Sequence, residues 1–431
     1  MRFEFLADVM RNADYFKNKN VTVVGLARSG IACANLLFNL DAKVSVTDIS
    51  DNPSTRLFAS RLKSKNINLE LGRHSPEFIQ GRDFIVVSPG VTNSSPALVW
   101  ADKFNIPAIS EIEVAWILCP SPVIATTGSS GKTTVATLIA KVLEVSGKKA
   151  FICGNIGTPF CAEVDKIGPD DFVSLEVSSF QLERIRKFKP KIAVMLNFSR
   201  NHLDRYKDMQ EYLEAKKRIF VNQDKNDFLV LNGQDPVLKN LSKETKAKVV
   251  YFSESKDLNP NQAAVVTVGS ILGIDRDTCL RVFAEFGGLE HRLEYVTQIN
   301  NIKFINDSKA TTVESTAWAL KNIPSPIILI AGGRDKGLDY KVILDLAREK
   351  VKEVILIGEA KEKIRVALEG FLSLDEAKTM EEAVNKAFHK AQAGDCVLLS
   401  PMCSSFDMFV NYEDRGRVFK DAVYNLAKNK I

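Results

Sequence analysis

Residues Ala125 to Thr134 have the types and spacing of a phosphate-binding loop. They read ATTGSSGKTT, after an apolar run and before the helical pattern VATLIAKVLEVSG. Backbone N–H groups of such a glycine turn, and of the helix that follows, can surround the β- and γ-phosphates of a nucleotide. Lys132 adds a cation and Thr133 adds a hydroxyl for Mg²⁺. The usual pattern has glycine at position 126, where this chain has Thr126, but strand, turn, lysine, hydroxyl and helix all follow in order.

Two polar segments follow strand-like runs behind this loop. VSLEVSSFQLE (173 to 183) reaches Glu176 at the end of its apolar run, and MLNFSRNHLDRY (195 to 206) delivers His202 and Asp204. Open α/β sheets bind ligands at the carboxyl ends of their strands. A single loop histidine is more often structural, and a single glutamate is usually solvated. Glu176 and His202, however, follow successive strands after a phosphate loop. This placement favours a metal site over a structural role.

A third candidate lies on the helix that the segment EYLEAKKRIF predicts. This helix starts near Met209 and carries Tyr212 and Lys216 four residues apart, so the two side chains share one helix face. Spacing gives no reason to select this lysine from the others in the chain. By pattern alone, we interpret Lys216 as a solvated surface residue.

The amino-terminal glycine turn is a weaker signal. GLARSG (Gly25 to Gly30) has Ala27 where the dinucleotide-binding fingerprint has its middle glycine, and Asp48 ends the next strand-like run. A Cβ at position 27 would crowd a pyrophosphate lying tightly across the turn. We therefore favour a nucleotide held differently from NAD, and a purely structural turn is the alternative.

Strand-like runs alternate with helical patterns throughout the chain, which is typical of parallel α/β sheets. VTVVGLARSG and PVIATTGSSGKTT each look like a first strand that enters a glycine turn and a helix, and a third series of strands begins near residue 301. Three sheets follow from this. We predict an α/β chain with a Rossmann-like N-terminal domain, a central P-loop ATPase-like parallel sheet and a Rossmann-like C-terminal domain, at residues 1–105, 106–289 and 290–431.

Bulk composition excludes several classes of protein. The 431 residues include 58 basic and 53 acidic side chains, an asymmetry too small to indicate nucleic-acid binding. The seven cysteines form no CxxC pair, so neither a disulfide framework nor a zinc site is indicated. The sequence has no cationic leader followed by an apolar run, and no stretch of about 20 apolar residues that would span a membrane. We expect a cytoplasmic protein.

Taken together, the motifs resemble the Mur ligase family, and the resemblance covers nearly the whole chain. EVSSFQLE is the most discriminating segment, because relatives that add diaminopimelate or lysine typically carry histidine where this chain has Phe180. The other matching motifs are TTGSSGKTT, GNIG (154 to 157), NHLDRY, HR (291 to 292), NDSKAT (306 to 311) and LSPMCSSFDMFVNYEDRG (399 to 416).

The resemblance implies a ligase that uses ATP and Mg²⁺ to add D-glutamate to UDP-N-acetylmuramoyl-L-alanine in peptidoglycan precursor synthesis. The alanine carboxylate would attack the γ-phosphate and form an acyl phosphate, which the amine of D-glutamate then attacks. Phosphorylation is needed because a carboxylate is a poor electrophile without an adequate leaving group. Positioning and charge neutralisation would carry most of the catalysis. The implied partners are these two small molecules, without nucleic acid or membrane insertion, and we expect a monomer.

The same resemblance assigns roles around the phosphates. Two Mg²⁺ ions are implied, with Thr133, Glu176, His202 and Lys216 as metal-binding residues. Lys216 matches a lysine that carries a CO₂-derived carbamate in the family, whose carboxylate supplies two oxygens to the metals. Lys132 and Lys309 would lie near the transferred phosphoryl group. Leu258 stands at the usual position of the first asparagine in the family's ATP motif. The implied ATP contacts are Gly128, Ser129, Ser130, Gly131, Lys132, Thr133, Thr134, Asn261, Arg292 and Asp307.

The two acceptor substrates are assigned in the same way. A cation such as Lys336 suits a dicarboxylic amino acid, and an ordinary loop lysine is the alternative. Ser50 replaces an arginine that some relatives carry, so contacts on the uracil side are expected to be fewer. The implied D-glutamate contacts are Thr311, Lys336, Ser405 and Tyr412. The implied contacts of the UDP-linked precursor are Arg28, Ser29, Gly30, Asp48, Ser88, Gly90, Asn155 and Ser178.

Two alternatives stay open at this point. Another Mur-type ligase, which adds alanine, lysine or diaminopimelate, or a folylpolyglutamate synthase would share the central ATP domain. A P-loop switch that hydrolyses ATP to change partners belongs to a different class, and the glycine-lysine-threonine turn alone permits it. The product separates these classes, because a ligase makes one amide for each ATP consumed.

Overall fold

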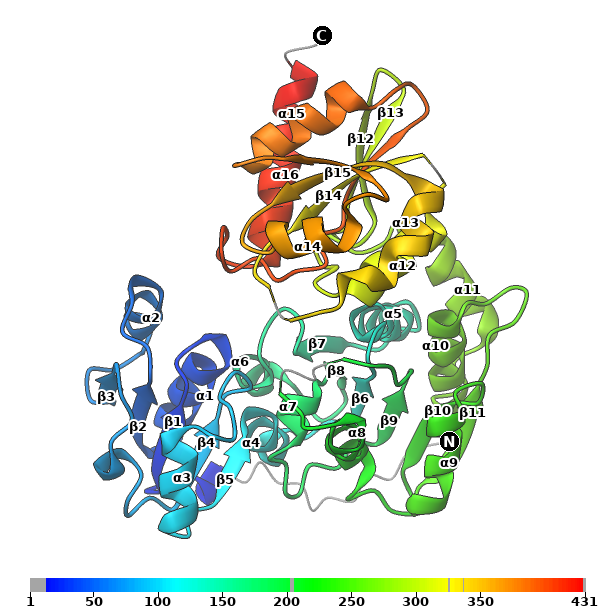
Figure 1. Ribbon diagram of the computed structural model, residues 1–431. Helices are drawn as coiled ribbons and strands as arrows, with labels where there is room; N and C mark the ends of the chain where they lie inside the picture. The colour runs from blue at the N-terminus through cyan, green and yellow to red at the C-terminus, as the bar shows by residue number, and fades with distance from the viewer. Residues whose placement is uncertain (1–12, 202–204, 325, 336, 429–431) are drawn as a thin grey trace. The chain divides into compact units, whose positions relative to one another are not determined.

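The computed structural model describes residues 13–201, 205–324, 326–335 and 337–428, and it contains three β-sheets flanked by helices (Figure 1). The chain forms two compact units, Met1–Phe286 and Gly287–Ile431. The first unit contains two of the sheets and the second contains one. The predicted α/β class with three sheets is confirmed. Among the helices of the described residues, none is both long and apolar enough to cross a membrane.

The first sheet has five parallel strands in the order β3-β2-β1-β4-β5. Its central strands are apolar because both faces are covered: Val23 packs in one core and Val24 in the other. Strand β5 extends this sheet beyond residue 105, and the exact domain boundaries stay a prediction. The elements are η1 (Ala13–Tyr15), β1 (Asn20–Val24), α1 (Arg28–Asn39), β2 (Lys43–Asp48), α2 (Pro53–Ala59), β3 (Asn68–Leu71), η2 (Pro76–Phe78), β4 (Phe84–Val87), α3 (Pro96–Lys103) and β5 (Ala108–Ser110).

The second sheet has six parallel strands in the order β11-β10-β9-β6-β8-β7. Strand β6 lies between β8 and β9, so the carboxyl ends of all three meet beside the loop that leaves β6. The first elements are α4 (Glu111–Leu118), β6 (Val123–Thr127), α5 (Lys132–Val145), β7 (Ala150–Gly154), α6 (Phe160–Glu163), η3 (Val164–Lys166), β8 (Phe172–Glu176), α7 (Ser179–Leu182) and β9 (Ile192–Met195). The remaining elements are α8 (Met209–Lys217), η4 (Arg218–Phe220), β10 (Phe228–Asn232), α9 (Pro236–Asn240), η5 (Leu241–Glu244), β11 (Lys248–Phe252), α10 (Pro260–Ile271) and α11 (Arg276–Glu285).

The third sheet has the order β12-β13-β17-β14-β15-β16, and β12 runs antiparallel to β13 at its edge. The two strands are joined by Asn300 and Asn301, whose φ values of 49° and 62° fit a tight hairpin turn. The elements are β12 (Glu294–Ile299), β13 (Ile302–Asn306), α12 (Val313–Asn322), β14 (Ile327–Gly332), η6 (Tyr340–Ile343), α13 (Leu344–Lys350), β15 (Val351–Ile357), α14 (Lys361–Leu368), β16 (Ser373–Glu376), α15 (Met380–Lys390), β17 (Cys396–Leu399) and α16 (Tyr412–Lys428).

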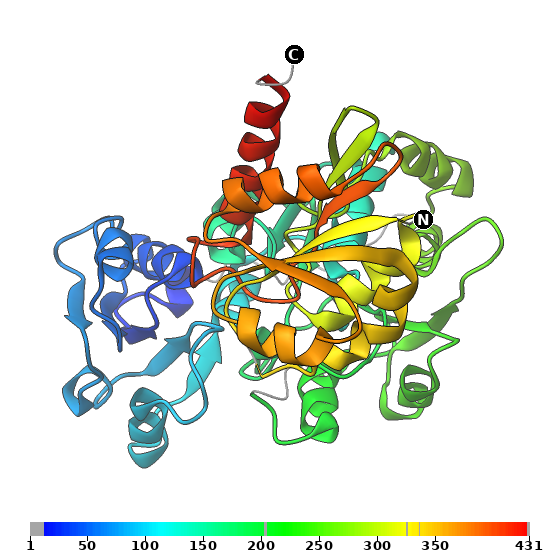
Figure 2. The same cartoon turned by 45° about the horizontal axis from the view of Figure 1, so that its top comes forward.

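Helices cover both faces of this third sheet. On one face, Leu320 of α12 and Ile364 of α14 pack in the same core as Leu329 of β14. On the other, Val384 of α15 and Phe419 of α16 pack in a second core. Figure 2 shows the strands passing between these two groups of helices. The two-sided burial explains why the strands are nearly continuous apolar runs.

Candidate active site

The loop after β6 turns at two glycines with positive φ angles. Gly128 has φ 158°, and Gly131, the N-cap residue of α5, has φ 82°. A Cβ on Gly131 would lie only 2.5 Å from Oδ1 of Asn261, so Asn261 stands directly against the loop. Thr126 lies within β6 and is fully buried, in an extended position that suits a β-branched residue. The turn begins after Thr126, which explains why the chain needs no glycine there.

Asn197, which the sequence analysis did not single out, braces this loop from the end of β9. Its Oδ1 accepts a hydrogen bond from the N–H of Ser130 at 2.9 Å, and its Nδ2 donates to the Ser130 carbonyl at 3.2 Å. Its own carbonyl accepts from the N–H of Ser129 at 3.1 Å. The N–H groups offered to a phosphate are therefore those of the first turn of α5. The position of Asn197 directly after an apolar run was the sequence feature that could have identified it.

The side chain of Lys132 folds back over the loop. Its Nζ donates to the carbonyl of Gly128 at 2.9 Å and to that of Ser129 at 3.3 Å. Thr133 is buried and Thr134 is half-buried in the first turn of α5. The structure thus gathers the predicted phosphate contacts of this unit at one helix N-terminus, where negative charge is stabilised.

Glu176 ends β8 beside β6 and is 3% exposed. Its Oε1 accepts from Nδ2 of Asn155 at 2.7 Å, whereas its Oε2 is buried without a hydrogen-bond partner among the described residues. A buried carboxylate oxygen left without a partner is costly, which is expected where a cation binds. The hydroxyl of Thr133 and this carboxylate are the hard oxygen donors that Mg²⁺ prefers. His202 and Asp204 lie outside the described residues.

Lys216 on α8 is only 2% exposed, so its interpretation as a solvated residue was wrong. Its Nζ donates to the carbonyl of Gly128 at 3.0 Å and approaches Oγ1 of Thr127 at 3.5 Å. Burial, reinforced by the charge of Lys132, holds the pKa of Lys216 well below its usual value. The side chain shares the buried helix face with Tyr212, and Nζ lies 4.7 Å from that ring centroid. The four-residue spacing from Tyr212 did not by itself indicate this burial.

Around the amino-terminal glycine turn, Asp48 is occupied by main-chain groups. Its Oδ2 accepts from the N–H of Leu26 at 2.6 Å and its Oδ1 accepts from the N–H of Ser50 at 2.8 Å. Each carboxylate oxygen keeps a second acceptor direction. Asp48 therefore shapes the turn, and a ribose hydroxyl would be a third partner.

The other predicted precursor contacts of this sheet gather at the same turn. The Ser88 hydroxyl donates to the carbonyl of Gly25 at 2.7 Å. A Cβ on Gly30 would lie 2.0 Å from that carbonyl, so α1 can pack on the turn only because residue 30 is glycine. Arg28 and Gly90 are exposed and Ser29 is half-buried. In the second sheet, Asn155 contacts Glu176, and Ser178 forms a capping box with Gln181 at the start of α7.

In the second unit, Asp307 follows β13 and is 5% exposed. Its carboxylate accepts from the hydroxyl of Ser400 at 2.9 Å and from the N–H of Leu293 at 3.2 Å. Burial raises the pKa of Asp307 to about 7, against these hydrogen bonds and the charge of Arg292. Arg292 and Asp307, both predicted to contact ATP, are therefore electrostatic neighbours.

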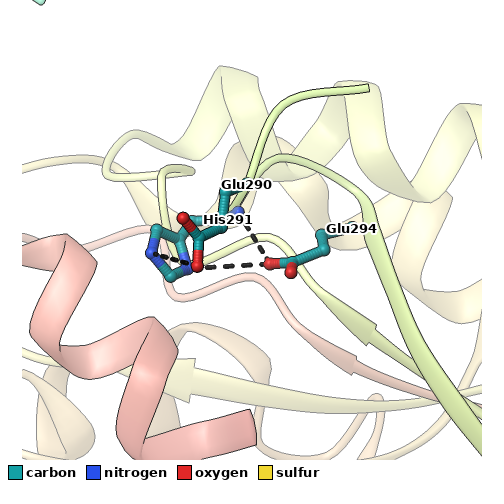
Figure 3. Close-up of side chains that lie close together, drawn as sticks. All are labelled: Glu290, His291 and Glu294. Atoms are coloured by element: carbon teal, nitrogen blue, oxygen red, sulfur yellow. Dashed lines mark hydrogen bonds and ion pairs between the residues drawn. The ribbon is translucent and has the colours of Figure 1, made fainter. Parts of the chain in front are cut away.

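His291 lies beside Glu290 and Glu294, and the three form the one cluster of at least three potential metal ligands found among the described residues (Figure 3). Lys420 donates to Glu290 at 2.5 Å and to Glu294 at 2.9 Å, so an ammonium group already balances these carboxylates. The His291 N–H donates to Glu294 at 2.8 Å, and its carbonyl accepts from the N–H of Lys309 at 3.0 Å. We interpret this cluster as a brace for the Lys309 loop and not as a metal centre.

Tyr412, the first residue of α16, lies beside the loop that carries Ser308 and Lys309. The Nζ of Lys309 lies 5.4 Å from the ring centroid of Tyr412, and the hydroxyl of Ser308 donates to the Tyr412 carbonyl at 2.8 Å. The N–H of Thr311 donates to the carbonyl of Lys309 at 2.9 Å, and Ser405 is buried. Lys336 lies outside the described residues.

Arg415, a second residue that the sequence analysis missed, joins these loops from inside the protein. It is 0% exposed; Nε and Nη2 donate to the hydroxyl and carbonyl of Ser308 at 3.0 and 2.8 Å, and Nη1 donates to the carbonyl of Cys403 at 3.1 Å. Burial lowers the pKa of Arg415 to about 10. An arginine on the otherwise apolar stripe of α16 was the signal that could have identified it.

Three family models match the chain in order. The Mur ligase MurD-like N-terminal domain matches residues 19–110, the Mur ligase middle domain matches residues 126–273, and the Mur ligase glutamate ligase domain matches residues 291–403. These ranges correspond to the three sheets.

Similar proteins extend over nearly the full chain. The UDP-N-acetylmuramoylalanine--D-glutamate ligase of Thermoanaerobacter sp. (strain X514) is 37% identical over 96% of this chain and 99% of its own length. The protein of the same name from Geotalea daltonii is 39% identical over 95% of this chain and 98% of its own length.

Among solved structures, UDP-N-acetylmuramate-alanine ligase MurC from Thermotoga maritima aligns with a TM-score of 0.60 at 18% identity, over 96% of this chain and 100% of that one. MurF ligase from Thermotoga maritima, solved in complex with ADP, aligns with a TM-score of 0.58 at 15% identity, over 98% of this chain and 100% of that one. At these identities the likeness shows a shared fold. Together with the family models and the full-length relatives, it establishes that the chain belongs to the Mur ligase family.

Proposed function

We propose that this chain is an ATP-dependent ligase that adds D-glutamate to UDP-N-acetylmuramoyl-L-alanine through an acyl phosphate, in peptidoglycan precursor synthesis. The observation that carries the proposal is the 37% to 39% identity, over 95% to 96% of the chain, to relatives named for that reaction. The phosphate loop with its buried glutamate supports the ATP-dependent part independently.

The reaction has two bond-forming steps. A carboxylate oxygen of the precursor attacks the γ-phosphorus of ATP, and the bond to ADP breaks. The amine of D-glutamate then attacks the acyl carbon, and the tetrahedral intermediate releases phosphate while the amine loses a proton. The N-terminus of α5 and Lys132 would hold the phosphates and stabilise the negative charge that develops on the transferred group.

Thr133 and Glu176 fit a Mg²⁺ ion because both offer hard oxygen donors, and Glu176 has a buried oxygen that lacks a partner among the described residues. When bound, Mg²⁺ would neutralise phosphate charge at this position. His202 would contribute to a second ion. The buried Oε2 of Glu176 is the structural feature that supports the assignment of the first ion.

Lys216 is proposed to carry a carbamate formed with CO₂: the neutral amine nitrogen forms a bond to carbon, and one proton is released. The support is geometric. Lys216 is buried at the phosphate loop, and no carboxylate forms an ion pair with it among the described residues. A buried ammonium without a counter-ion is costly, whereas a carbamate would be an anion beside the metal-binding residues. The lowered pKa of Lys216 favours the neutral amine that this reaction needs.

The remaining assignments complete the proposal. Asn261, Arg292 and Asp307 are proposed to contact ATP, and Lys309 to lie near the reacting phosphate. The precursor would be bound by Arg28, Ser29, Gly30, Asp48, Ser88, Gly90, Asn155 and Ser178. D-glutamate would be bound by Thr311, Lys336, Ser405 and Tyr412.

Phosphate release and amide formation, measured together, test the function. The chain is incubated with ATP, Mg²⁺, UDP-N-acetylmuramoyl-L-alanine and, in separate reactions, D-glutamate, L-alanine, L-lysine or diaminopimelate. We expect one amide for each phosphate with D-glutamate only. Dependence on another amino acid would indicate a different Mur-type ligase. Turnover with a folate acceptor in place of the precursor would indicate a folylpolyglutamate synthase, and ATP hydrolysis that ignores acceptor and amine would indicate a switch.

A further inference from the structure

Arg205 links the two sheets of the first unit through main-chain acceptors. Its Nη1 donates to the carbonyl of Pro89 at 2.8 Å, and its Nη2 donates to the carbonyl of Val91 at 2.9 Å. Nη2 also contacts Oε2 of Glu183 at 3.3 Å, and the side chains of Arg205 and Glu183 are each 12% exposed. One guanidinium group therefore ties a loop that follows β4 to a residue that follows α7.

The surroundings fix the plane of this guanidinium. Its Cζ lies 4.2 Å from the ring centroid of Phe180, and this ring stacks on Tyr206 at 5.8 Å. The hydroxyl of Tyr206 donates to the other carboxylate oxygen of Glu183 at 2.6 Å. A planar group that stacks on one face and donates from two nitrogens along its edge requires arginine, because a lysine ammonium cannot meet these contacts together.

The two segments that Arg205 joins carry the two halves of the proposed precursor site. Pro89 and Val91 flank Gly90 and follow Ser88, whose hydroxyl contacts the amino-terminal glycine turn. Glu183 is the C-cap residue of α7, and Ser178 caps the other end of this short helix. Arg205 thus connects the Gly90 loop of the first sheet with the α7 segment of the second.

We propose that Arg205 is a positioning residue that sets the distance between these two halves of the precursor site. The inference rests on the proposed function, because it needs one ligand that touches both segments. Without the hydrogen bonds from Arg205, the Gly90 loop would shift relative to Ser178. A precursor that contacts both segments would then bind less tightly. The phosphate loop is braced separately by Asn197, so binding of ATP does not depend on Arg205.

Steady-state kinetics of Arg205→Met and Arg205→Lys test this inference, with Arg184→Met as the matched control. Arg184 lies at the same junction, where its Nη2 donates to Oδ1 of Asn93 at 2.6 Å, but its side chain makes no hydrogen bond to the Pro89–Val91 loop. We expect both Arg205 variants to raise the KM for UDP-N-acetylmuramoyl-L-alanine at least about tenfold, which corresponds to about 1.4 kcal/mol. The KM for ATP, and every constant of Arg184→Met, should stay within about twofold.

Three results would overturn the inference. One is an unchanged precursor KM in an active Arg205 variant, another is an equal rise in the KM for ATP, and the third is an equal effect of Arg184→Met. Should Arg205→Met fail to fold, Arg205→Lys and Glu183→Gln carry the same test, with the same expected rise. A wild-type chain that neither binds nor converts the precursor would overturn the proposed function, and this inference with it.

Discussion

The central and C-terminal sheets each have a buried basic side chain near the carboxyl ends of their strands, and the two side chains make different hydrogen bonds. Arg415 is 0% exposed and donates from three nitrogens to acceptors on two loops. Lys216 is 2% exposed, and its hydrogen bonds among the described residues are one to a carbonyl at 3.0 Å and one at the limit of 3.5 Å to a hydroxyl. At the same burial, Arg415 has three hydrogen bonds of ordinary length, whereas Lys216 has one of ordinary length and one at the limit.

This difference distinguishes Arg415, which has a structural role, from Lys216, which lies in the candidate active site. Arg415 makes hydrogen bonds that connect the Ser308 and Cys403 loops, so these donors act within the fold. Beside Lys216, Glu176 keeps a buried oxygen without a described partner. Buried polar groups are almost always satisfied in folded proteins, and the exceptions gather where a ligand completes them. Lys216 thus lies beside a carboxylate that can still bind a ligand, whereas the hydrogen bonds of Arg415 go to acceptors within the C-terminal unit.

The largest effect is expected for Arg415→Met, which removes three hydrogen bonds and leaves buried acceptors without donors. We expect the C-terminal unit to lose about 3 kcal/mol of unfolding free energy. Urea unfolding can follow this unit by the fluorescence of Trp318 after Trp100 and Trp116 are replaced with phenylalanine. Arg417→Met, on the exposed side of the same helix, should change stability by less than about 0.5 kcal/mol. Equal losses in the two variants would contradict the role of Arg415 as a brace.

A second test concerns the buried acid of the C-terminal unit. Asp307 keeps its proton up to about pH 7 in the folded protein and loses it near pH 3.8 when unfolded. Because the folded state binds more protons between these values, stability should fall as the pH rises from about 4 to 7, by on the order of 3 kcal/mol. Asp307→Asn should remove this fall in urea unfolding followed at several pH values. A variant with the same pH dependence as the wild type would contradict the assignment.

For the central sheet we expect a loss of activity without a loss of stability. Lys216→Ala should lower the rate of amide formation at least about 100-fold, because a metal-binding anion is lost. Formate or acetate should restore part of the rate. Lys217→Ala is the matched control, since Lys217 is paired with Glu214 and Glu244 and should keep its rate within about twofold.

The stability of Lys216→Met sharpens the comparison with Arg415. Replacing a buried basic side chain that forms no ion pair among the described residues with an apolar side chain should leave the unfolding free energy within about 1 kcal/mol of the wild type, or raise it. A loss as large as that of Arg415→Met would show that Lys216 is a structural brace after all. Wild-type activity in Lys216→Ala would instead remove the lysine from the site.

The smallest loss of enzymatic function is expected at the phosphate loop. Asn197→Ala removes both side-chain hydrogen bonds to Ser130, so the loop should bind ATP less well and the KM for ATP should rise about tenfold. Asn232→Ala is the control, because that asparagine ends the neighbouring strand β10 and donates to the carbonyl of Leu196 instead of the loop. Equal changes in the two variants would show a general effect of strand-end asparagines.

The sequence by itself determined the local elements and the phosphate loop. The run from Val123 to Val145 combines an apolar strand, two glycines with special backbone angles and an amphipathic helix, and each of these is encoded within a few neighbouring residues. The family and the substrates were then assigned from the resemblance of the motifs to those of Mur ligases. Neither source indicated the antiparallel edge strand β12, whose direction depends on the two-residue turn before β13.

Tertiary structure alone decided which polar residues are buried and what they contact. Lys216 is a surface residue by pattern, yet its Nζ reaches a carbonyl 88 positions away in the chain. Arg415 reaches Ser308 across 107 positions, and Arg205 reaches Pro89 across 116. The hydrogen-bond partners of a buried charged side chain are brought together by folding, so a local pattern can at most indicate that the residue lies on a buried helix face. The sequence therefore indicated where the phosphates bind, and the packing of distant segments determined the burial and the hydrogen-bond partners of each charged side chain.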